Sequence, residues 1–180
     1  AFGRAIGYQD AWERSSALWD GIVTRKTILA GYDTTMAIRE DGTVVAVGDV
    51  VADVGAWKDV IDIEDDPMIG LCSDGTVISN LEHKYEKEEE CGLCSGTNIV
   101  AISGYFGLRA DGTVVLHKDS FSDSSIQAQV DGWSETVGIC AFGDDLIVGL
   151  SASGSVMCAG DSMWGAPSIS GWKNIVAVST

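Results

Sequence analysis

A short motif that recurs at regular intervals constrains the fold of this chain most strongly. Asp-Gly-Thr-Val, followed by Val or Ile, begins at Asp41, Asp74 and Asp111, and a degraded copy begins at Ser153. A Trp followed three residues later by a β-branched residue occurs at Trp19, Trp57, Trp133 and Trp172, and Gly96 takes the Trp position in the remaining unit. Successive Trp positions are between 37 and 39 residues apart. Such a fixed period predicts a tandem array of one structural unit.

Each unit shows the same order of apolar runs and turns. A β-branched run such as 99–103 follows the Trp position, then come a short polar or glycine-containing link and a second run such as 35–38. Asp-Gly and a third run, for example 43–47, complete the pattern. Asp-Gly between two apolar runs predicts a two-residue hairpin turn in which both residues have positive φ. We therefore expect three strands per unit, with room for a fourth near the Trp, and helical spacing only weakly at residues 8–19.

Short antiparallel strands with a hairpin in every unit predict an all-β fold made of β-propeller blades. The strands are almost continuous in Val, Ile, Ala and Leu. This composition indicates burial on both faces of each sheet, as between neighbouring blades. A parallel β-helix is the competing all-β repeat fold, but its coils are usually shorter and need no hairpin in every unit.

The repeats resemble those of the regulator of chromosome condensation family, in short bacterial form. The closest copies run from Trp19 to Gly48 and from Gly96 to Val115, and the family's final glycine appears as Gly48 and Gly160. The resemblance implies a β-propeller that serves as a rigid binding platform. Its members include an exchange factor for a small nuclear GTPase, ubiquitin-ligase scaffolds and bacterial, often cell-surface, repeat arrays. The units here are shorter than in the exchange factor, and no inserted hairpin that could act as an exchange wedge is evident.

The repeat boundaries predict four full units and two partial ones. The full units span roughly 19–56, 57–95, 96–132 and 133–171, and the partial units span 1–18 and 172–180. Residues 1–3 match residues 158–160, so the N-terminal part resembles the back half of a unit. We expect a piece of a longer propeller. A roughly five-bladed ring with one incomplete blade and assembly with a second copy are the alternatives, and an open array exposes strand edges that favour self-association.

The charge of the chain limits its partners. Eleven basic and 27 acidic residues give a formal net charge of -16. Nucleic-acid phosphates and anionic membrane surfaces both attract cationic proteins, so we expect neither as a partner. No apolar run approaches the ~20 residues of a membrane-spanning helix. An acidic surface favours a basic protein partner.

The five cysteines do not suggest a disulfide framework. Cys72, Cys140 and Cys158 lie in apolar runs, where reduced, buried thiols are the simplest interpretation. This use of cysteine leans weakly towards a reducing cytoplasm. The sequence leaves a bacterial cytoplasmic location and a secreted or cell-surface location both open.

One acidic segment carries the weak metal-site candidate. His83, Cys91 and Cys94 could supply three zinc ligands, but a structural zinc site needs four. A local disulfide or reactive dithiol is an alternative, and an acidic loop that stays in solvent is the favoured interpretation. The paired carboxylates at 65–66 and 144–145 lack calcium-loop spacing. We expect no cofactor.

Catalysis is not indicated, because neither His83 nor His117 lies near a nucleophile motif. Trp57, Trp133 and Trp172 share one repeat position and are expected to pack between blades. Trp12, Tyr85 and Trp164 fall outside the repeat pattern, and we predict ligand contact for these three. The sequence thus predicts a non-catalytic protein-binding scaffold, with a carbohydrate-binding module and a guanine-nucleotide exchange factor as the second and third alternatives.

Overall fold

The computed structural model describes residues 25–31, 33–48, 54–79, 92–117, 124–160, 169 and 171–179. Its strands are β1 (Ile28–Ala30), β2 (Thr34–Ile38), β3 (Val44–Gly48), β4 (Val60–Asp65), β5 (Met68–Cys72), β6 (Val77–Ser79), β7 (Ile99–Ser103), β8 (Phe106–Arg109), β9 (Val114–Leu116), β10 (Thr136–Phe142), β11 (Leu146–Ser151) and β12 (Val156–Gly160). Within these ranges the helices are the 3-10 helix η1 (Val54–Ala56) and the α-helix α3 (Ser124–Val130). No helix in these ranges is long and apolar enough to cross a membrane. The prediction of an all-β fold is confirmed.

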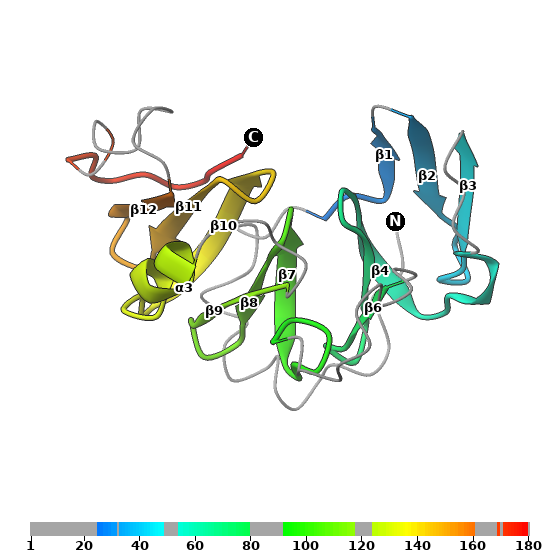
Figure 1. Ribbon diagram of the computed structural model, residues 1–180, viewed down its shortest axis with the longest axis horizontal. Helices are drawn as coiled ribbons and strands as arrows, with labels where there is room; N and C mark the ends of the chain where they lie inside the picture. The colour runs from blue at the N-terminus through cyan, green and yellow to red at the C-terminus, as the bar shows by residue number, and fades with distance from the viewer. Residues whose placement is uncertain are drawn as a thin grey trace.

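The strands form four separate antiparallel sheets of three strands each. We call them the first (β1–β3), second (β4–β6), third (β7–β9) and fourth (β10–β12) sheet. Each is built from consecutive strands, and the four follow one another along an arc with β1, β4, β7 and β10 towards its inner side (Figure 1). One sheet lies within each of the four full repeats predicted from the sequence.

The hydrophobic core consists of three clusters, one between each pair of consecutive sheets. Met36 and Val44 of the first sheet pack with Val60 and Ile63 of the second. Similar clusters join the second sheet to the third and the third to the fourth. The second and third sheets are therefore covered on both faces, and every residue of β5 and of β7 is buried. This burial explains why their sequences are continuously apolar instead of alternating.

The Asp-Gly turns differ from the predicted two-residue form. The Arg39 amide donates to the Thr43 carbonyl at 2.8 Å, and the Gly42 amide donates to the Arg39 carbonyl at 2.9 Å. Gly42 has φ +79°, whereas Asp41 is not among the residues with positive φ. The loop is therefore a type I turn followed by a left-handed glycine, the three-residue hairpin connection. The prediction of positive φ at both turn residues was wrong, because the aspartate has a different role.

That role is to hold the turn through its carboxylate. Asp41 Oδ1 accepts hydrogen bonds from the Thr43 amide at 3.0 Å and from Thr43 Oγ1 at 2.6 Å. The same pair of bonds occurs at Asp74 and at Asp111. These hydrogen bonds from threonine lower the pKa of all three aspartates. The Asp-Gly-Thr motif is thus explained by turn geometry.

A helical turn, and not a fourth strand, precedes the Trp position. The Trp57 amide donates to the Val54 carbonyl at 3.0 Å, and the Trp133 amide donates to the Val130 carbonyl at 2.8 Å. Before Trp133 this turn extends into α3, in which Ile126 and Val130 are buried. The sequence did not predict α3, because two apolar positions in a helix of seven residues give no recognisable periodicity.

A left-handed residue two positions after the Trp links each sheet to the next. Asp59, Asn98, Glu135 and Asn174 all have φ between 56° and 63°. The amide that follows donates to the turn glycine of the preceding sheet, from Val60 to Gly42 at 3.0 Å and from Ile99 to Gly75 at 3.1 Å. Asp and Asn tolerate this conformation better than most residues. The Asp-Gly turn therefore anchors the start of the following sheet as well as its own hairpin.

The Trp position packs on a glycine in the middle strand of its own sheet. A Cβ at Gly70 would lie 3.1 Å from the Trp57 ring, and a Cβ at Gly149 would lie 2.5 Å from the Trp133 ring. In the unit that has no Trp, the side chain of Leu93 covers Gly107 instead. Trp57 is buried and Trp133 half-buried, whereas Trp172 is 54% exposed.

Candidate functional site

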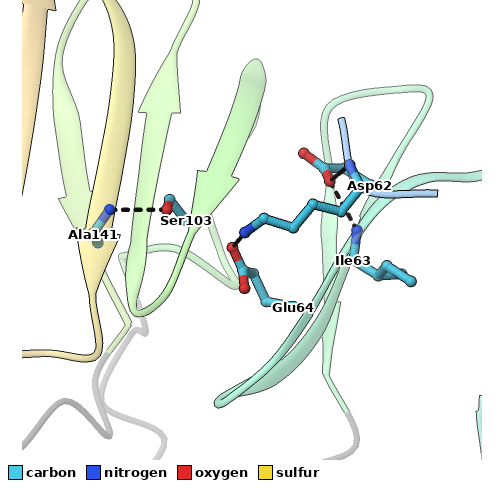
Figure 2. A network of polar contacts seen from close by, with 6 residues as sticks. Asp62, Ile63, Glu64, Ser103 and Ala141 are labelled. Carbon is cyan, nitrogen blue, oxygen red and sulfur yellow. Dashed lines mark hydrogen bonds and ion pairs between the residues drawn. The ribbon is translucent and has the colours of Figure 1, made fainter. Parts of the chain in front are cut away.

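One position of the repeat places polar side chains along the inner side of the arc. Seven residues after the Trp position, successive units carry Lys26, Glu64, Ser103 and Cys140. Together with Asp62 on β4 they form what we call the inner polar cluster, most of which is shown in Figure 2. These residues come from four different sheets or their leading segments, so the repeat brings together groups that are far apart in sequence.

Lys26 ties the segment before β1 to the second sheet. Its ammonium forms an ion pair with Glu64 Oε1 (Figure 2). Its backbone amide donates to Asp62 Oδ1 at 2.7 Å. The Lys26 side chain is partly exposed, whereas Asp62 and Glu64 are 1% and 6% exposed. Two carboxylates on β4 thus share one lysine across the interface between sheets.

Asp62 is the most perturbed acid among the described residues. Its Oδ1 also accepts the Ile63 amide at 3.0 Å, but its Oδ2 is buried without a hydrogen-bond partner. Burial raises the pKa of Asp62 to about 7, against the opposing effects of the Lys26 amide and ammonium. Glu64 adds a repulsive charge that raises the pKa further. A carboxyl group in such surroundings takes up a proton near neutral pH.

Glu64 and Ser103 each hold the inner strand of the following sheet. The Ser103 hydroxyl accepts the Ala141 amide at 3.0 Å (Figure 2). The Gly104 amide, at the corresponding place one sheet earlier, donates to the Glu64 carboxylate. Burial raises the pKa of Glu64, and the Lys26 ammonium and this amide oppose the effect. The cluster therefore fastens successive inner strands to one another.

Cys140 continues the series on the fourth sheet. Burial raises the pKa of this thiol, and the charge of Lys26 acts in the opposite direction. Lys26 leads into the first sheet and Cys140 belongs to the fourth, so the charge of a residue near one end of the arc acts on a thiol near the other.

The inner polar cluster has a structural role, because its polar groups bond neighbouring sheets to one another. Within the described part of the chain, no group of three or more His, Cys, Asp or Glu side chains could hold a metal ion. The Lys26 ammonium is engaged by Glu64, and the Ser103 hydroxyl is engaged by a backbone amide. Asp62 Oδ2 is buried and has no hydrogen-bond partner among the described residues.

Most residues predicted to contact a ligand or a metal ion lie outside the described ranges. Trp12, Tyr85 and Trp164, the predicted ligand contacts, are among them, as are His83 and Cys91. These predictions therefore remain predictions. Cys94, the third candidate zinc ligand, is half-buried and packs against the core between the second and third sheets.

The other candidates occupy structural positions. His117 follows β9, is buried, and lies edge-on to Tyr105 with ring centroids 6.1 Å apart. The carboxylate pair at 65–66 begins in β4, and Asp66 accepts the Tyr105 hydroxyl at 2.9 Å. The pair at 144–145 lies in the turn between β10 and β11, so the two carboxylate pairs belong to different sheets.

The three cysteines in apolar runs were expected to be reduced and buried, and the structure is close to this expectation. Cys72 and Cys140 are buried and Cys158 is half-buried, and all three are free. Burial raises the pKa of each. They therefore act as small apolar side chains, as their apolar sequence surroundings predicted.

Sequence reasoning missed the inner polar cluster, although a signal was present. Lys26, Glu64, Ser103 and Cys140 share one repeat position, and Asp62 interrupts the apolar run of β4. Alignment of the units on the Trp position would have shown polar residues in a column that ought to be buried. Comparison with protein-family models, curated proteins and solved structures finds no match to this chain. Its function is therefore argued from the geometry described above.

Proposed function

We propose that the four sheets are blades of a propeller of the regulator of chromosome condensation type, and that this propeller is a non-catalytic scaffold for a protein partner. Support comes from the sequential order of the sheets, from their inner strands lying towards one side and from the effect of the Lys26 charge on the pKa of Cys140. Radial repetition of small sheets is the arrangement that accounts for all three.

The observation that carries the binding role is the contrast between two kinds of connection. Turns within a sheet are short and held by repeated hydrogen bonds, as at Asp74 and Asp111. Connections between sheets are longer and differ in length, for example between Gly48 and Val60 and between Ser79 and Ile99. Binding surfaces are usually built from such variable loops on a rigid framework. We place the partner-binding surface on the loops between sheets.

The net negative charge of the chain indicates which kind of protein it would bind. The net charge of -16 favours a basic protein, and the sequence between β6 and β7 contains consecutive acidic residues at Glu88, Glu89 and Glu90. A contact of this kind gives fast, salt-sensitive association.

Selection of peptide ligands on the immobilised full chain tests this proposal. We expect enrichment of basic ligands whose affinity falls by at least tenfold between about 0.05 and 0.5 M salt. Replacing Glu88, Glu89 and Glu90 by Gln should weaken these ligands. A matched triple variant, Glu40→Gln with Asp131→Asn and Asp145→Asn, removes the same charge from exposed or turn positions and should leave affinity nearly unchanged.

Two results would overturn the proposal. Enrichment of apolar ligands with salt-insensitive affinity would show that the partner is not a basic protein. Equal loss of affinity in both triple variants would show that binding depends on net charge alone and not on the three glutamates. Sugar binding that is lost in Trp164→Ala would instead support a carbohydrate-binding module. Accelerated nucleotide release from a small GTPase would support an exchange factor. No described residue favours either of these alternatives.

A further inference from the structure

Asp-Gly steps occur five times in the chain, and four of them lie in the described ranges. These four begin at Asp41, Asp74, Asp111 and Asp131, whereas the step at Asp20 lies outside those ranges. Such a step can react within itself, because glycine has no side chain to keep its amide nitrogen away from the aspartate Cγ. The surroundings of each step therefore decide whether the reaction takes place.

Three of the four steps are the repeat turns, and these turns hold both reacting groups. In each turn one aspartate oxygen accepts hydrogen bonds from the amide and the hydroxyl of the threonine two residues later. The glycine amide donates to the carbonyl of the residue three positions earlier, at 2.9 Å for Gly42, 3.0 Å for Gly75 and 2.9 Å for Gly112. An amide that donates in this way keeps its proton and stays turned away from Cγ.

The repeat turns are also fixed by the sheet that follows. The Val60 amide donates to the Gly42 carbonyl, and the Ile99 amide donates to the Gly75 carbonyl. A Cβ at Gly112 would lie 3.0 Å from the Glu135 backbone nitrogen. The threonine hydrogen bonds lower the pKa of each turn aspartate, so that near neutral pH less carboxyl is in the protonated form from which water can leave.

The fourth step, Asp131-Gly132, is held much less. It directly follows α3, and both residues are exposed. The Gly132 amide donates no hydrogen bond to another described residue. A Cβ at Gly132 would meet nothing closer than the Gln129 carbonyl oxygen at 4.0 Å. Asp131 Oδ1 accepts a hydrogen bond from the side chain of Gln127, but none from a described backbone amide.

We propose that Asp131 is a site of spontaneous modification, at which aspartate converts to isoaspartate through a cyclic imide with Gly132. The Gly132 nitrogen attacks Asp131 Cγ, so that a C–N bond forms and a Cγ–O bond breaks. The nitrogen's proton and the hydroxyl leave together as water. Water then adds back to the imide. Cleavage between the nitrogen and Cγ restores aspartate, whereas cleavage between the nitrogen and the main-chain carbonyl carbon leaves a chain that runs through Cγ.

The modification acts on the segment that positions Trp133. Isoaspartate adds one carbon to the main chain between Val130 and Trp133, whose amide and carbonyl are joined by a hydrogen bond of 2.8 Å. The Trp133 ring covers Gly149 in the middle strand of the fourth sheet. We therefore expect the longer chain to break this hydrogen bond and to loosen the packing of Trp133 on the fourth sheet.

Incubation of the full chain at about pH 7 and 37 °C tests the proposal. Digestion and mass spectrometry with electron-transfer fragmentation locate isoaspartate at each step. We expect it to form at Asp131 at least tenfold faster than at Asp41, Asp74 or Asp111, because three hydrogen bonds must break in each repeat turn. The same incubation of the urea-unfolded chain is the matched control. All four steps have glycine at the reacting amide, so their rates should then be similar.

A variant identifies the reacting amide. Gly132→Ala places a side chain beside this nitrogen and should slow the reaction at Asp131, while the rates at the repeat turns stay the same. Absence of isoaspartate at Asp131 in the folded chain, or equal rates at Asp131 and the repeat turns, would overturn the proposal. So would the same preference for Asp131 in the unfolded chain, or an unchanged rate in Gly132→Ala. None of these results depends on the proposed partner binding.

Discussion

Replacing Asp62 by Asn should change how the stability of the protein depends on pH. In the folded protein the Asp62 carboxyl is 1% exposed, and burial raises its pKa to about 7 from the usual 3.8. The folded state therefore keeps a proton that the unfolded chain releases. The stability associated with this group is full below about pH 4 and is lost as the pH rises through about 7.

The magnitude follows from the size of the pKa shift. About three pKa units correspond to roughly 4 kcal/mol, at 1.36 kcal/mol per unit. Asn keeps the Oδ1 acceptor for the Lys26 and Ile63 amides but cannot ionise. Its amide would be a buried donor at the position of Oδ2, with a pH-independent cost of about 1–3 kcal/mol. The difference in unfolding free energy between Asp62→Asn and the natural chain should therefore rise by up to about 4 kcal/mol from pH 4 to pH 8.

Urea unfolding at half-unit steps from pH 4 to pH 8.5, followed by circular dichroism, measures this difference directly. The other ionisable groups that act on Asp62 are Lys26 and Glu64, and both are present in the two proteins. Glu40→Gln, in an exposed turn, provides a control that changes the net charge equally and should show no such trend. A parallel pair of stability curves for Asp62→Asn and the natural chain would refute the reasoning, because it would mean that Asp62 titrates alike in both states.

Three further substitutions test the repeat itself. Gly48→Ala should destabilise the protein by about 2 kcal/mol or more, since φ is +148° and the new Cβ would overlap the Asp33 carbonyl oxygen, whereas Gly171→Ala has open space and should be neutral in thermal unfolding. Leu93→Ala should lower the urea-derived unfolding free energy by about 2–5 kcal/mol, because this fully buried side chain covers a middle-strand glycine. Asp74→Ala should lower the unfolding free energy by about 1 kcal/mol at pH 7. This difference should shrink as the pH falls below 4, because the hydrogen bonds that lower the pKa of Asp74 stabilise its ionised form.

The repeat period made the strands and their order predictable. β7 was expected at 99–103 and is found there, and β2 and β3 lie within one residue of expectation. Such accuracy is possible because each unit contains the same local signals and errors in one copy are corrected by the others. The helical turn before the Trp was not predicted, because its few apolar positions have no periodicity of their own.

The candidate site was much harder to predict. Lys26 and Glu64 are separated by a full repeat, and only the packing of one sheet on the next brings them together. The sequence drew attention to aromatic and cysteine residues instead, since these stand out by type. A buried charge is recognisable only after the surrounding residues are known to exclude water.

The amino-acid sequence by itself determined that the chain folds as repeated three-stranded sheets with Asp-Gly turns, because strand propensity and turn geometry are local properties. The tertiary structure decided how neighbouring sheets are fastened and which polar groups lose contact with water. Those properties depend on contacts between residues about 38 positions apart, which no local pattern encodes.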